Sequence, residues 1–274
     1  MNLYNTKEVV DEIYYIEKNI RPLSPEPTKR ILITGSTAGI GFLTAKTLIM
    51  KGYKVVVHAR NEERAKDARR DLPEAEAVVT GDLSDLKEVK KLAGDINALG
   101  TFDVIIHNAG VYDARSSGNA ILNVNALAPY ILTSLLKKPR QLIYLCSDLH
   151  LGGNLKLQSM QDKSSDINYS DSKLQVLVMS KAVSRKWRDV KVNAVNPGWV
   201  ATKMGKSGAP DDLRLSYGTL VWLAEGTEEG SNVTGQLLFQ KKIEKNYNLA
   251  ANDPATQDAL LETYAKVTGV SFPN

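Results

Sequence analysis

The sequence predicts a single α/β domain built on a doubly wound parallel sheet with helices on both faces. From Arg30 onward, short apolar runs rich in valine and isoleucine alternate with longer amphipathic stretches. This alternation favours parallel strands joined by right-handed helical crossovers. The chain of 274 residues, 43% of them apolar and 24% charged, has the size and composition of one ordinary globular domain.

An N-terminal arm of residues 1–28 is expected ahead of this domain, which then spans residues 29–274. Apolar residues from Val9 to Ile20 recur at roughly helical spacing, with charged residues between them. The proline-rich run 22–27 stops the helix and favours an extended connector. We interpret the arm as an amphipathic helix docked on the domain or on a partner subunit. A membrane-surface helix is the weaker alternative, because the polar face is not rich in Lys or Arg.

The elements of the domain follow in order. Each expected strand is a short apolar run, and each expected helix is a longer stretch with apolar residues at helical spacing. The strands are Ile31–Thr34, Lys54–His58, Ala77–Thr80, Val104–His107, Leu142–Leu145 and Val190–Val195. The helices are Gly39–Met50, Asn61–Asp71, Asp85–Leu99, Asn119–Lys137, Ser170–Trp187 and Ala255–Val267.

Charge and cysteine content argue against several other classes of protein. The 35 basic and 31 acidic residues give a net charge of +4, and the basic ones are scattered rather than gathered in a stripe, so no nucleic-acid partner is expected. Cys146 is the only cysteine, so no disulfide can form within the chain, which fits a cytoplasmic location. We expect no metal site, because His58, His107 and His150 belong to no ligand pattern. We also expect no signal peptide and no membrane span, because the N-terminus lacks a basic segment followed by an apolar one and no apolar run approaches the ~20 residues that span a bilayer.

A glycine loop follows the first expected strand and opens the next helix, with the sequence Thr34-Gly35-Ser36-Thr37-Ala38-Gly39-Ile40-Gly41. Gly35 permits a tight turn, Gly39 lets the backbone approach a pyrophosphate, and Gly41 allows close packing of helix on strand. The amides at the start of the helix then face the phosphate charge. The loop in this setting predicts a Rossmann-type dinucleotide site.

The spacing T-G-x-x-x-G-x-G resembles that of the short-chain dehydrogenase/reductase family, and two further short motifs lie where that family has them. Gly81-Asp82-Leu83 follows the third expected strand, and the resemblance implies that Asp82 and Leu83 contact the adenine. Asn108-Ala109-Gly110 follows the fourth expected strand and resembles the family's N-A-G motif, which supports the sheet and passes near the cofactor. The likeness covers residues 29–240.

The identity of the dinucleotide depends on the end of the second expected strand. NAD-specific enzymes usually carry an acidic residue near this point, which bonds the ribose 2′-hydroxyl. Ala59 stands in its place and Arg60 follows. An arginine can bind a 2′-phosphate through paired hydrogen bonds, whereas a carboxylate would repel it. The pattern favours NADP(H); the alternative is that Arg60 only begins a surface helix.

The run Tyr169-Ser170-Asp171-Ser172-Lys173 matches the family's Y-x-x-x-K. Residues four apart on a helix share a face, so the ammonium of Lys173 is expected close to the phenol of Tyr169. A nearby positive charge stabilises the phenolate and lowers the pKa of the phenol from its ordinary value of about 10. Tyr169 is then suited to act as a general acid or base.

The resemblance implies a catalytic tetrad that is completed by Asn125 and Ser147. Ser147 ends the fifth expected strand, where the family places the hydroxyl that hydrogen-bonds the substrate carbonyl. Asn125, which aligns with the family's helix better than Asn123 does, supports a water relay to Lys173. Cys146 stands where many relatives have a serine and is interpreted as a packed residue, not a nucleophile.

The run from Pro197 to Thr202 resembles the family's P-G-x-x-x-T. The resemblance implies that Pro197 and Gly198 turn the chain beside the nicotinamide. The backbone near Val200 and the Thr202 hydroxyl then hold its carboxamide. The glycine-containing segment Lys203–Asp212 is expected to be a mobile lid over the substrate.

The stretch Asp148–Ile167 and the run Val195–Val200 resemble the retinol dehydrogenase-like subgroup, which acts on apolar alcohols and aldehydes. The sequence thus predicts an NADP(H)-dependent oxidoreductase that transfers hydride between the nicotinamide and an aldehyde, ketone or alcohol. Tyr169 is its expected general acid/base.

Two alternatives stay open on the same fold. One is a catalytically silent NADP(H)-binding regulatory or scaffolding protein, and the other is an enzyme that epimerises or dehydrates a nucleotide sugar. Relatives often form dimers or tetramers through the helices that match Asn119–Lys137 and Ser170–Trp187, so a homo-oligomer is a further expectation.

Overall fold

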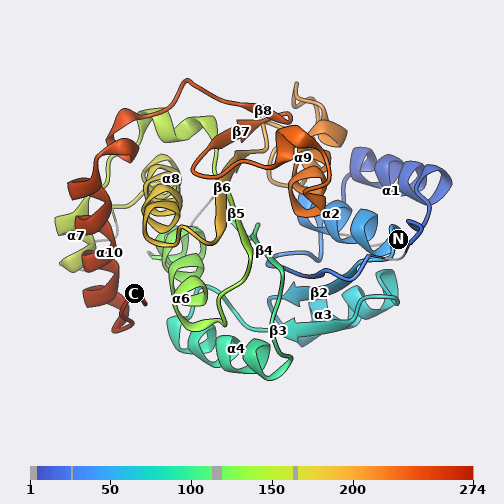
Figure 1. The fold of residues 1–274 in the computed structure, drawn as a ribbon, viewed down its shortest axis with the longest axis horizontal. Coiled ribbons are helices and arrows are strands. Elements are labelled where there is room, and N and C mark those ends of the chain that lie inside the picture. The colour runs from blue at the N-terminus through green and yellow to red at the C-terminus, as the bar shows by residue number, and fades with distance from the viewer. Residues whose placement is uncertain (1–4, 26, 113–118, 163–165, 274) are drawn as a thin grey trace.

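In the computed structural model the domain is built on one eight-stranded sheet (Figure 1). The structure describes residues 5–25, 27–112, 119–162 and 166–273, so positions 1–4 and 26 of the expected arm lie outside it. The strands are β1 (Arg30–Ile33), β2 (Lys54–Ala59), β3 (Ala77–Thr80), β4 (Val104–His107), β5 (Gln141–Leu145), β6 (Lys191–Asn196), β7 (Leu237–Phe239) and β8 (Lys242–Ile243).

The sheet has the order β3-β2-β1-β4-β5-β6-β7-β8 and is parallel from β3 to β7, while β8 runs antiparallel to β7. The strand order reverses at β1, where Ile31 lies between Val55 of β2 and Val104 of β4. In open sheets of this kind, ligands bind in the crevice at the carboxyl ends of the strands, where the order reverses. The predicted doubly wound sheet is confirmed.

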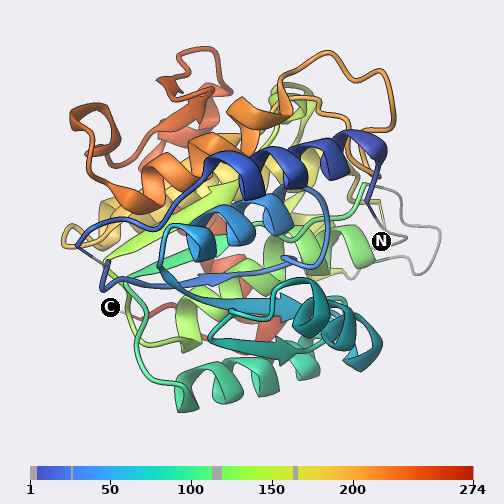
Figure 2. The same ribbon diagram turned by 90° about the vertical axis from the view of Figure 1, so that its right-hand side faces the viewer.

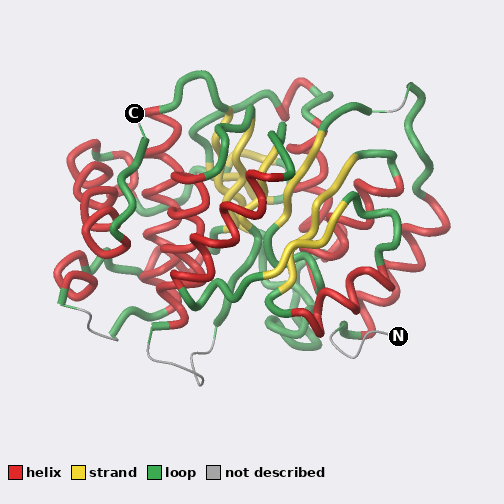
Figure 3. The backbone as a smooth tube through the Cα atoms, turned by 90° about the horizontal axis from the view of Figure 1, so that it is seen from below, coloured by secondary structure: helices red, strands yellow, loops and turns green. Residues whose placement is uncertain are grey.

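Helices cover both faces of the sheet (Figures 1 and 3). Side chains alternate along β1, so that Ile31 and Ile33 point into one core and Leu32 points into the other. The first core lies under α2 (Gly39–Met50), α3 (Glu62–Asp71) and α9 (Leu213–Glu225). The second lies under α4 (Leu86–Ala98), α6 (Ala128–Leu135) and α8 (Tyr169–Lys186).

An outer helix covers the inner ones on each side. Helix α1 (Lys7–Asn19) lies along α2 and α9, with Val9 and Ile16 fully buried (Figure 2). On the opposite side, α10 (Pro254–Thr268) and the short α7 (Leu157–Gln161) pack together, and α10 lies along α8 (Figure 1). The arm therefore docks on its own chain.

Each expected strand is present, with its ends shifted by at most one residue. The helix expected at Asn119–Lys137 is interrupted by a π-helical turn, Asn123–Leu127, between α5 (Ala120–Leu122) and α6. Helix α9 and strands β7 and β8 were not expected. Short 3-10 turns at Asp148–Gly152, Glu229–Ser231 and Leu249–Asn252 complete the described elements.

Candidate active site

The glycine loop lies at the carboxyl end of β1 and is backed by the segment that follows β4. Gly35 has a φ of +63°, and a side-chain carbon there would lie 2.8 Å from the Cα atom of Ala109. At Gly41 a side-chain carbon would lie 2.3 Å from Nδ2 of Asn108. That same Nδ2 donates to the Thr34 carbonyl at 2.9 Å and to the Gly35 carbonyl at 3.0 Å. Glycine is therefore required at both positions, and the N-A-G segment supports the loop.

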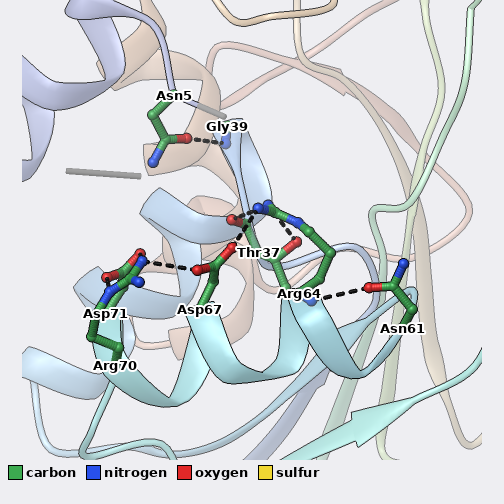
Figure 4. Close-up of polar contacts among 8 residues, drawn as sticks. All are labelled: Asn5, Thr37, Gly39, Asn61, Arg64, Asp67, Arg70 and Asp71. Carbon is green, nitrogen blue, oxygen red and sulfur yellow. Dashed lines mark hydrogen bonds and ion pairs between the residues drawn. The ribbon is translucent and has the colours of Figure 1, made fainter. Parts of the chain in front are cut away.

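The start of α2 has the form of a pyrophosphate cradle. Ala38 precedes the helix and provides no side-chain cap, so the first helical amides depend on other acceptors. Among the residues that the structure describes, a side-chain carbon at Gly39 would have only the Thr202 side chain within 4 Å, at 3.5 Å. The Gly39 amide donates to Oδ1 of Asn5 at 3.1 Å (Figure 4). Helix-start amides next to bare glycine backbone fit a phosphate group.

A histidine that the sequence analysis did not use holds this loop. His58, at the end of β2, is buried, and its Nδ1 accepts a hydrogen bond from the Gly35 amide at 3.0 Å. Its Nε2 lies 2.9 Å from the Gly81 carbonyl. Burial is the main influence on this imidazole and lowers its pKa. In the sequence, the only sign of this role was the position of His58 at the end of an expected strand.

Two arginines lie close to the end of β2. Arg60 is exposed and borders a pocket that is also lined by Asn61, Glu62, Thr80, Gly81, Asp82, Glu88 and Lys91. Arg64 lies in the first turn of α3, and only 8% of it is exposed. Its Nη2 donates to the Thr37 carbonyl at 2.9 Å and to Thr37 Oγ1 at 3.0 Å, and its Nη1 to Asp67 at 3.1 Å (Figure 4).

The expected adenine contacts differ in accessibility. Asp82 accepts hydrogen bonds at Oδ1 from the Ser84 amide at 2.8 Å and from the Ser84 hydroxyl at 2.7 Å. Leu83 is buried in the core beneath α4. Asp82 borders the pocket beside Arg60, and Leu83 does not.

Tyr169 and Lys173 occupy the first turns of α8, which begins with a capping box between Asn168 and Asp171. Lys173 is buried, and its Nζ lies 5.4 Å from the centre of the Tyr169 ring. The ammonium donates to the Leu145 carbonyl at 2.8 Å. Burial lowers the pKa of Lys173 to about 8, so the side chain remains mostly charged at neutral pH.

Burial is the main influence on the pKa of the Tyr169 phenol and raises it above the ordinary value. A hydrogen bond with the Ser147 side chain acts in the opposite direction. The ring of Tyr112 packs edge-on against Tyr169, with the ring centres 4.9 Å apart. The surrounding protein groups therefore raise the Tyr169 pKa, whereas the sequence analysis expected it to be lowered. The phenol holds its proton at neutral pH.

Asn125 lies in the π-helical turn, a feature that is frequent at functional sites. Its Oδ1 accepts from the Val111 amide at 2.8 Å, and its Nδ2 donates to the Val111 carbonyl at 2.9 Å and to Ser172 Oγ at 3.0 Å. A side-chain carbon at Gly110 would lie 3.5 Å from Asn125 Oδ1 and 3.6 Å from Lys173 Nζ. Asn123 instead donates to the Ser84 carbonyl at 2.7 Å, away from this group.

Ser147 follows β5 and caps the turn Asp148–Gly152. Its hydroxyl donates to Asp148 Oδ1 at 3.1 Å and accepts from the Leu149 amide at 3.3 Å. His150 is buried; its Nδ1 lies 2.5 Å from the Ser147 carbonyl, and its Nε2 accepts from the Asn248 amide at 3.3 Å. It therefore braces the turn.

Cys146, next to Ser147, is fully enclosed by the protein. Its thiol donates to the Lys173 carbonyl at 3.4 Å. Burial raises the pKa of Cys146 to about 11, so the thiolate is scarce at neutral pH. These features agree with a packing role and not with nucleophilic chemistry.

The segment after β6 turns at Gly198, which has a φ of +79° and lies against Asp211. Asp211 accepts from the Trp199 amide at 2.6 Å, and its own amide donates to the Trp199 carbonyl at 3.1 Å. Val200 and Thr202 are buried, and Thr202 lies against Gly39 of the glycine loop, while the residues between Thr202 and Asp211 are largely exposed. The loop that was expected as a lid is thus tied at its end to Trp199.

Among the described residues, no group of three or more His, Cys, Asp or Glu side chains could hold a metal ion. Within the same part of the chain, no helix has both the length and the apolar character needed to cross a bilayer.

Comparison with known proteins identifies relatives across most of the chain. A family model for short chain dehydrogenases matches residues 29–212. An uncharacterized oxidoreductase of Emericella nidulans is 39% identical over 254 residues, covering 89% of this chain and 98% of the relative. A short-chain dehydrogenase of Penicillium rubens is 38% identical over 263 residues, covering 89% and 99%. Human retinol dehydrogenase 13 is 27% identical over 270 residues, covering 90% and 76%.

Solved structures share the fold. An uncharacterized protein of Mycobacterium paratuberculosis superimposes with a TM-score of 0.74 at 21% identity, covering 94% of this chain and 98% of that one. A blue fluorescent protein from a metagenomic library, solved in complex with NADPH, gives a TM-score of 0.63 at 20% identity, covering 77% and 95%.

Proposed function

This chain belongs to the short-chain dehydrogenase/reductase family and is an oxidoreductase of that family; on that premise we propose that it is an NADP(H)-dependent enzyme that reduces an aldehyde or ketone to the alcohol. One observation carries the proposal. Lys173 Nζ lies 5.4 Å from the centre of the Tyr169 ring, and Asn125 Oδ1 and Lys173 Nζ both lie beside Gly110, while the Ser147 side chain is among the groups that act on the Tyr169 phenol.

In this proposal each residue of the site has its own role in the reaction. A bound nicotinamide supplies the hydride. Ser147 hydrogen-bonds the substrate oxygen, and Tyr169 gives its phenolic proton to that oxygen as negative charge develops on it. Because burial raises the pKa of Tyr169, the phenol carries the proton needed for reduction at neutral pH. The ammonium of Lys173 then stabilises the phenolate that remains.

The other motif residues hold the dinucleotide in this proposal. The pyrophosphate lies on the amides at the start of α2, the carboxamide is held by the backbone near Val200 and by the Thr202 hydroxyl, and Asp82 faces the adenine. Holding the carboxamide fixes which face of the ring reacts.

A preference for NADP(H) follows from the charges at the end of β2. Ala59 provides no carboxylate to repel a 2′-phosphate, and Arg60 is exposed beside the pocket. Arg64 adds positive charge at the same end while it holds Thr37 in the loop. A structural relative solved with NADPH agrees with this choice.

The substrate is proposed to be an apolar carbonyl compound. Tyr112, Leu149 and Trp199 are exposed, and they follow the carboxyl ends of β4, β5 and β6. Adjacent strand ends bring such side chains to one edge of the sheet. Relatives that carry the name retinol dehydrogenase point to the same class. Because a single cysteine cannot form a disulfide within the chain, we propose that the enzyme works in a reducing compartment such as the cytoplasm.

The test is titration of the purified protein with NADPH and, separately, with NADH, followed by absorbance assays with a panel of aldehydes and ketones. Tight NADPH binding, with oxidation that is lost in Tyr169→Phe, is the expected result. A preference for NADH would contradict the interpretation of Arg60. Failure to bind either nucleotide would overturn the proposal as a whole.

A further inference from the structure

The N-terminal arm connects the glycine loop to the segment after β6 through two consecutive residues. Asn5 accepts a hydrogen bond at Oδ1 from the Gly39 amide at 3.1 Å (Figure 4). Thr6 donates through Oγ1 to the Ala201 carbonyl at 2.8 Å. Gly39 and Thr202 are neighbours across the same gap. The arm thus contacts both segments that are proposed to hold the cofactor.

The position of these two residues is fixed by α1. Thr6 caps the helix by accepting from the Val9 amide at 3.3 Å, and Val9 is fully buried. Glu17 pairs with Lys46 of α2 at 2.8 Å. The Glu12 carboxylate pairs with Arg214 of α9 at 2.8 Å and accepts from the Tyr217 hydroxyl at 2.8 Å. Asn5 is therefore placed by a docked helix and is not a loose tail residue.

The contact uses a donor that the cofactor needs. Gly39 is the first residue of α2, so its amide has no acceptor within the helix. Helix-start amides of this kind bind phosphate. An amide hydrogen makes one strong hydrogen bond, so Asn5 Oδ1 and a pyrophosphate oxygen cannot both accept it fully. The charged phosphate oxygen is the stronger acceptor of the two.

We propose that Asn5 is a further residue of the dinucleotide site, which competes with the pyrophosphate for the Gly39 amide and so limits how tightly NADP(H) is held. The inference rests on the proposed function. The arm also reaches the loop after Thr202, because Ser207 donates to Glu8 at 3.1 Å.

Two substitutions at Asn5 have opposite expected effects on the dissociation constant of NADPH. Asn5→Ala removes the competing acceptor and tightens binding about fivefold, the equivalent of one ordinary hydrogen bond. Asn5→Asp places a negative charge beside the amide, which holds the amide more strongly and repels the pyrophosphate, so binding weakens at least fivefold on the same scale. Fluorescence titration of NADPH measures both effects without turnover.

The controls separate this proposal from the proposed function. Asn19→Ala, at the far end of α1, removes only a local bond to the Tyr15 carbonyl and leaves the affinity unchanged. Adenosine 2′-monophosphate lacks the pyrophosphate, so its affinity does not respond to either change at Asn5. If the wild-type protein binds NADPH and Asn5→Ala leaves that affinity unchanged or weakens it, the competition is disproved and the proposed function stands. If the wild-type protein binds neither nucleotide, the proposed function fails first.

Discussion

The imidazole of His58 is a hydrogen-bond acceptor for the Gly35 amide, with 3.0 Å between Nδ1 and the amide nitrogen. Because the amide can only donate, Nδ1 carries no proton, and Nε2 donates to the Gly81 carbonyl at 2.9 Å. One side chain at the end of β2 therefore joins the glycine loop to the segment that follows β3. Protonation at Nδ1 would place two donors face to face and break the bond to Gly35.

We expect His58→Leu to weaken NADPH binding by about tenfold, because the Gly35 amide loses its acceptor and the loop loses its brace. His58→Gln offers an oxygen and an N–H group in place of the two ring nitrogens and should keep most of the affinity. Fluorescence titration with NADPH, alongside thermal melting of each variant, measures this. Equal losses in both variants would show that packing of the ring, and not its hydrogen bonds, supports the loop.

The buried histidines also predict acid sensitivity of the fold. Burial lowers the pKa of His58 and lowers that of His107 to about 3, whereas an unfolded histidine titrates near ~6.5. Below ~6.5 the unfolded chain takes up protons that the folded chain does not. The free energy of unfolding therefore falls as pH decreases from ~6.5, by about 1.4 kcal/mol per pH unit for each histidine until its folded pKa is reached.

Denaturant unfolding between pH 7 and pH 5, above the range of most carboxylates, measures this slope. His58→Gln should reduce it by about 1.4 kcal/mol per unit, the share of one histidine. A flat profile in the wild-type protein over this range would be incompatible with two neutral buried imidazoles.

The sequence predicted the inner layers of the fold well, because each strand from β1 to β6 is a local apolar run and most helices have a local period. Helix α9 was missed because nine of its thirteen residues are buried, including the unbroken run from Thr219 to Ala224, so it shows little polar–apolar alternation. Strands β7 and β8 are too short to have a pattern of their own. The π-helical turn at Asn123–Leu127 depends on Asn125 reaching the backbone of Val111, a contact that local sequence does not specify.

The candidate site shows the same division between local and tertiary information. Motifs contiguous in sequence, such as the glycine loop and Tyr169 with Lys173, were predictable because each one folds as a unit. His58 and Asn5 were not, because each reaches the glycine loop from a segment distant in sequence. The direction of the Tyr169 pKa was not predictable because its largest cause is burial, a property of the whole fold.

Lys173 is expected to contribute to activity at a cost in stability. Its pKa is lowered to about 8 by burial, so the folded protein holds a charge that water would solvate better. We expect Lys173→Met to reduce kcat/KM by at least ~100-fold while the free energy of unfolding at pH 7 does not fall. Activity assays and denaturant unfolding of the same preparations test both parts. A large loss of stability would show that the bond to the Leu145 carbonyl outweighs the desolvation of the ammonium.

The lowered pKa of Lys173 also predicts how the activity and the stability of the wild-type protein change with pH. Lys173 loses its proton above about 8 in the folded state, so the rate of carbonyl reduction should decline there. An unfolded lysine titrates near ~10.4, so between these values the unfolded chain binds more protons and stability rises with pH. The rate and the stability thus change in opposite directions across this range. A rate that stays constant to pH 10 would contradict the role of Lys173 as the charge behind Tyr169.

Arg60 is expected to decide between the two nicotinamide dinucleotides. Arg60→Ala should weaken NADPH binding about tenfold or more, the value of a charge-assisted hydrogen bond, and leave NADH binding unchanged. Arg140→Ala is the matched control, because its side chain is 90% exposed and it lies at the amino end of β5, next to Asp103 and away from the carboxyl ends of the strands. If NADPH and NADH lose affinity equally, Arg60 supports the loop rather than the 2′-phosphate.

Helix α8 is enclosed by its own chain, which leads us to expect a monomer rather than an oligomer formed through this helix. Helix α10 lies along it, with Asp258 paired to Arg185 at 2.5 Å and to Lys186 at 3.0 Å, and the Tyr264 hydroxyl donates to Gln175 at 3.1 Å. A second copy would have to displace this helix and its buried apolar side chains. Light scattering should therefore give about the 30.1 kDa of one chain. Leu260→Asp, which loosens α10, should expose α8 and promote self-association; a wild-type dimer that protects α8 from hydrogen exchange would rule this account out.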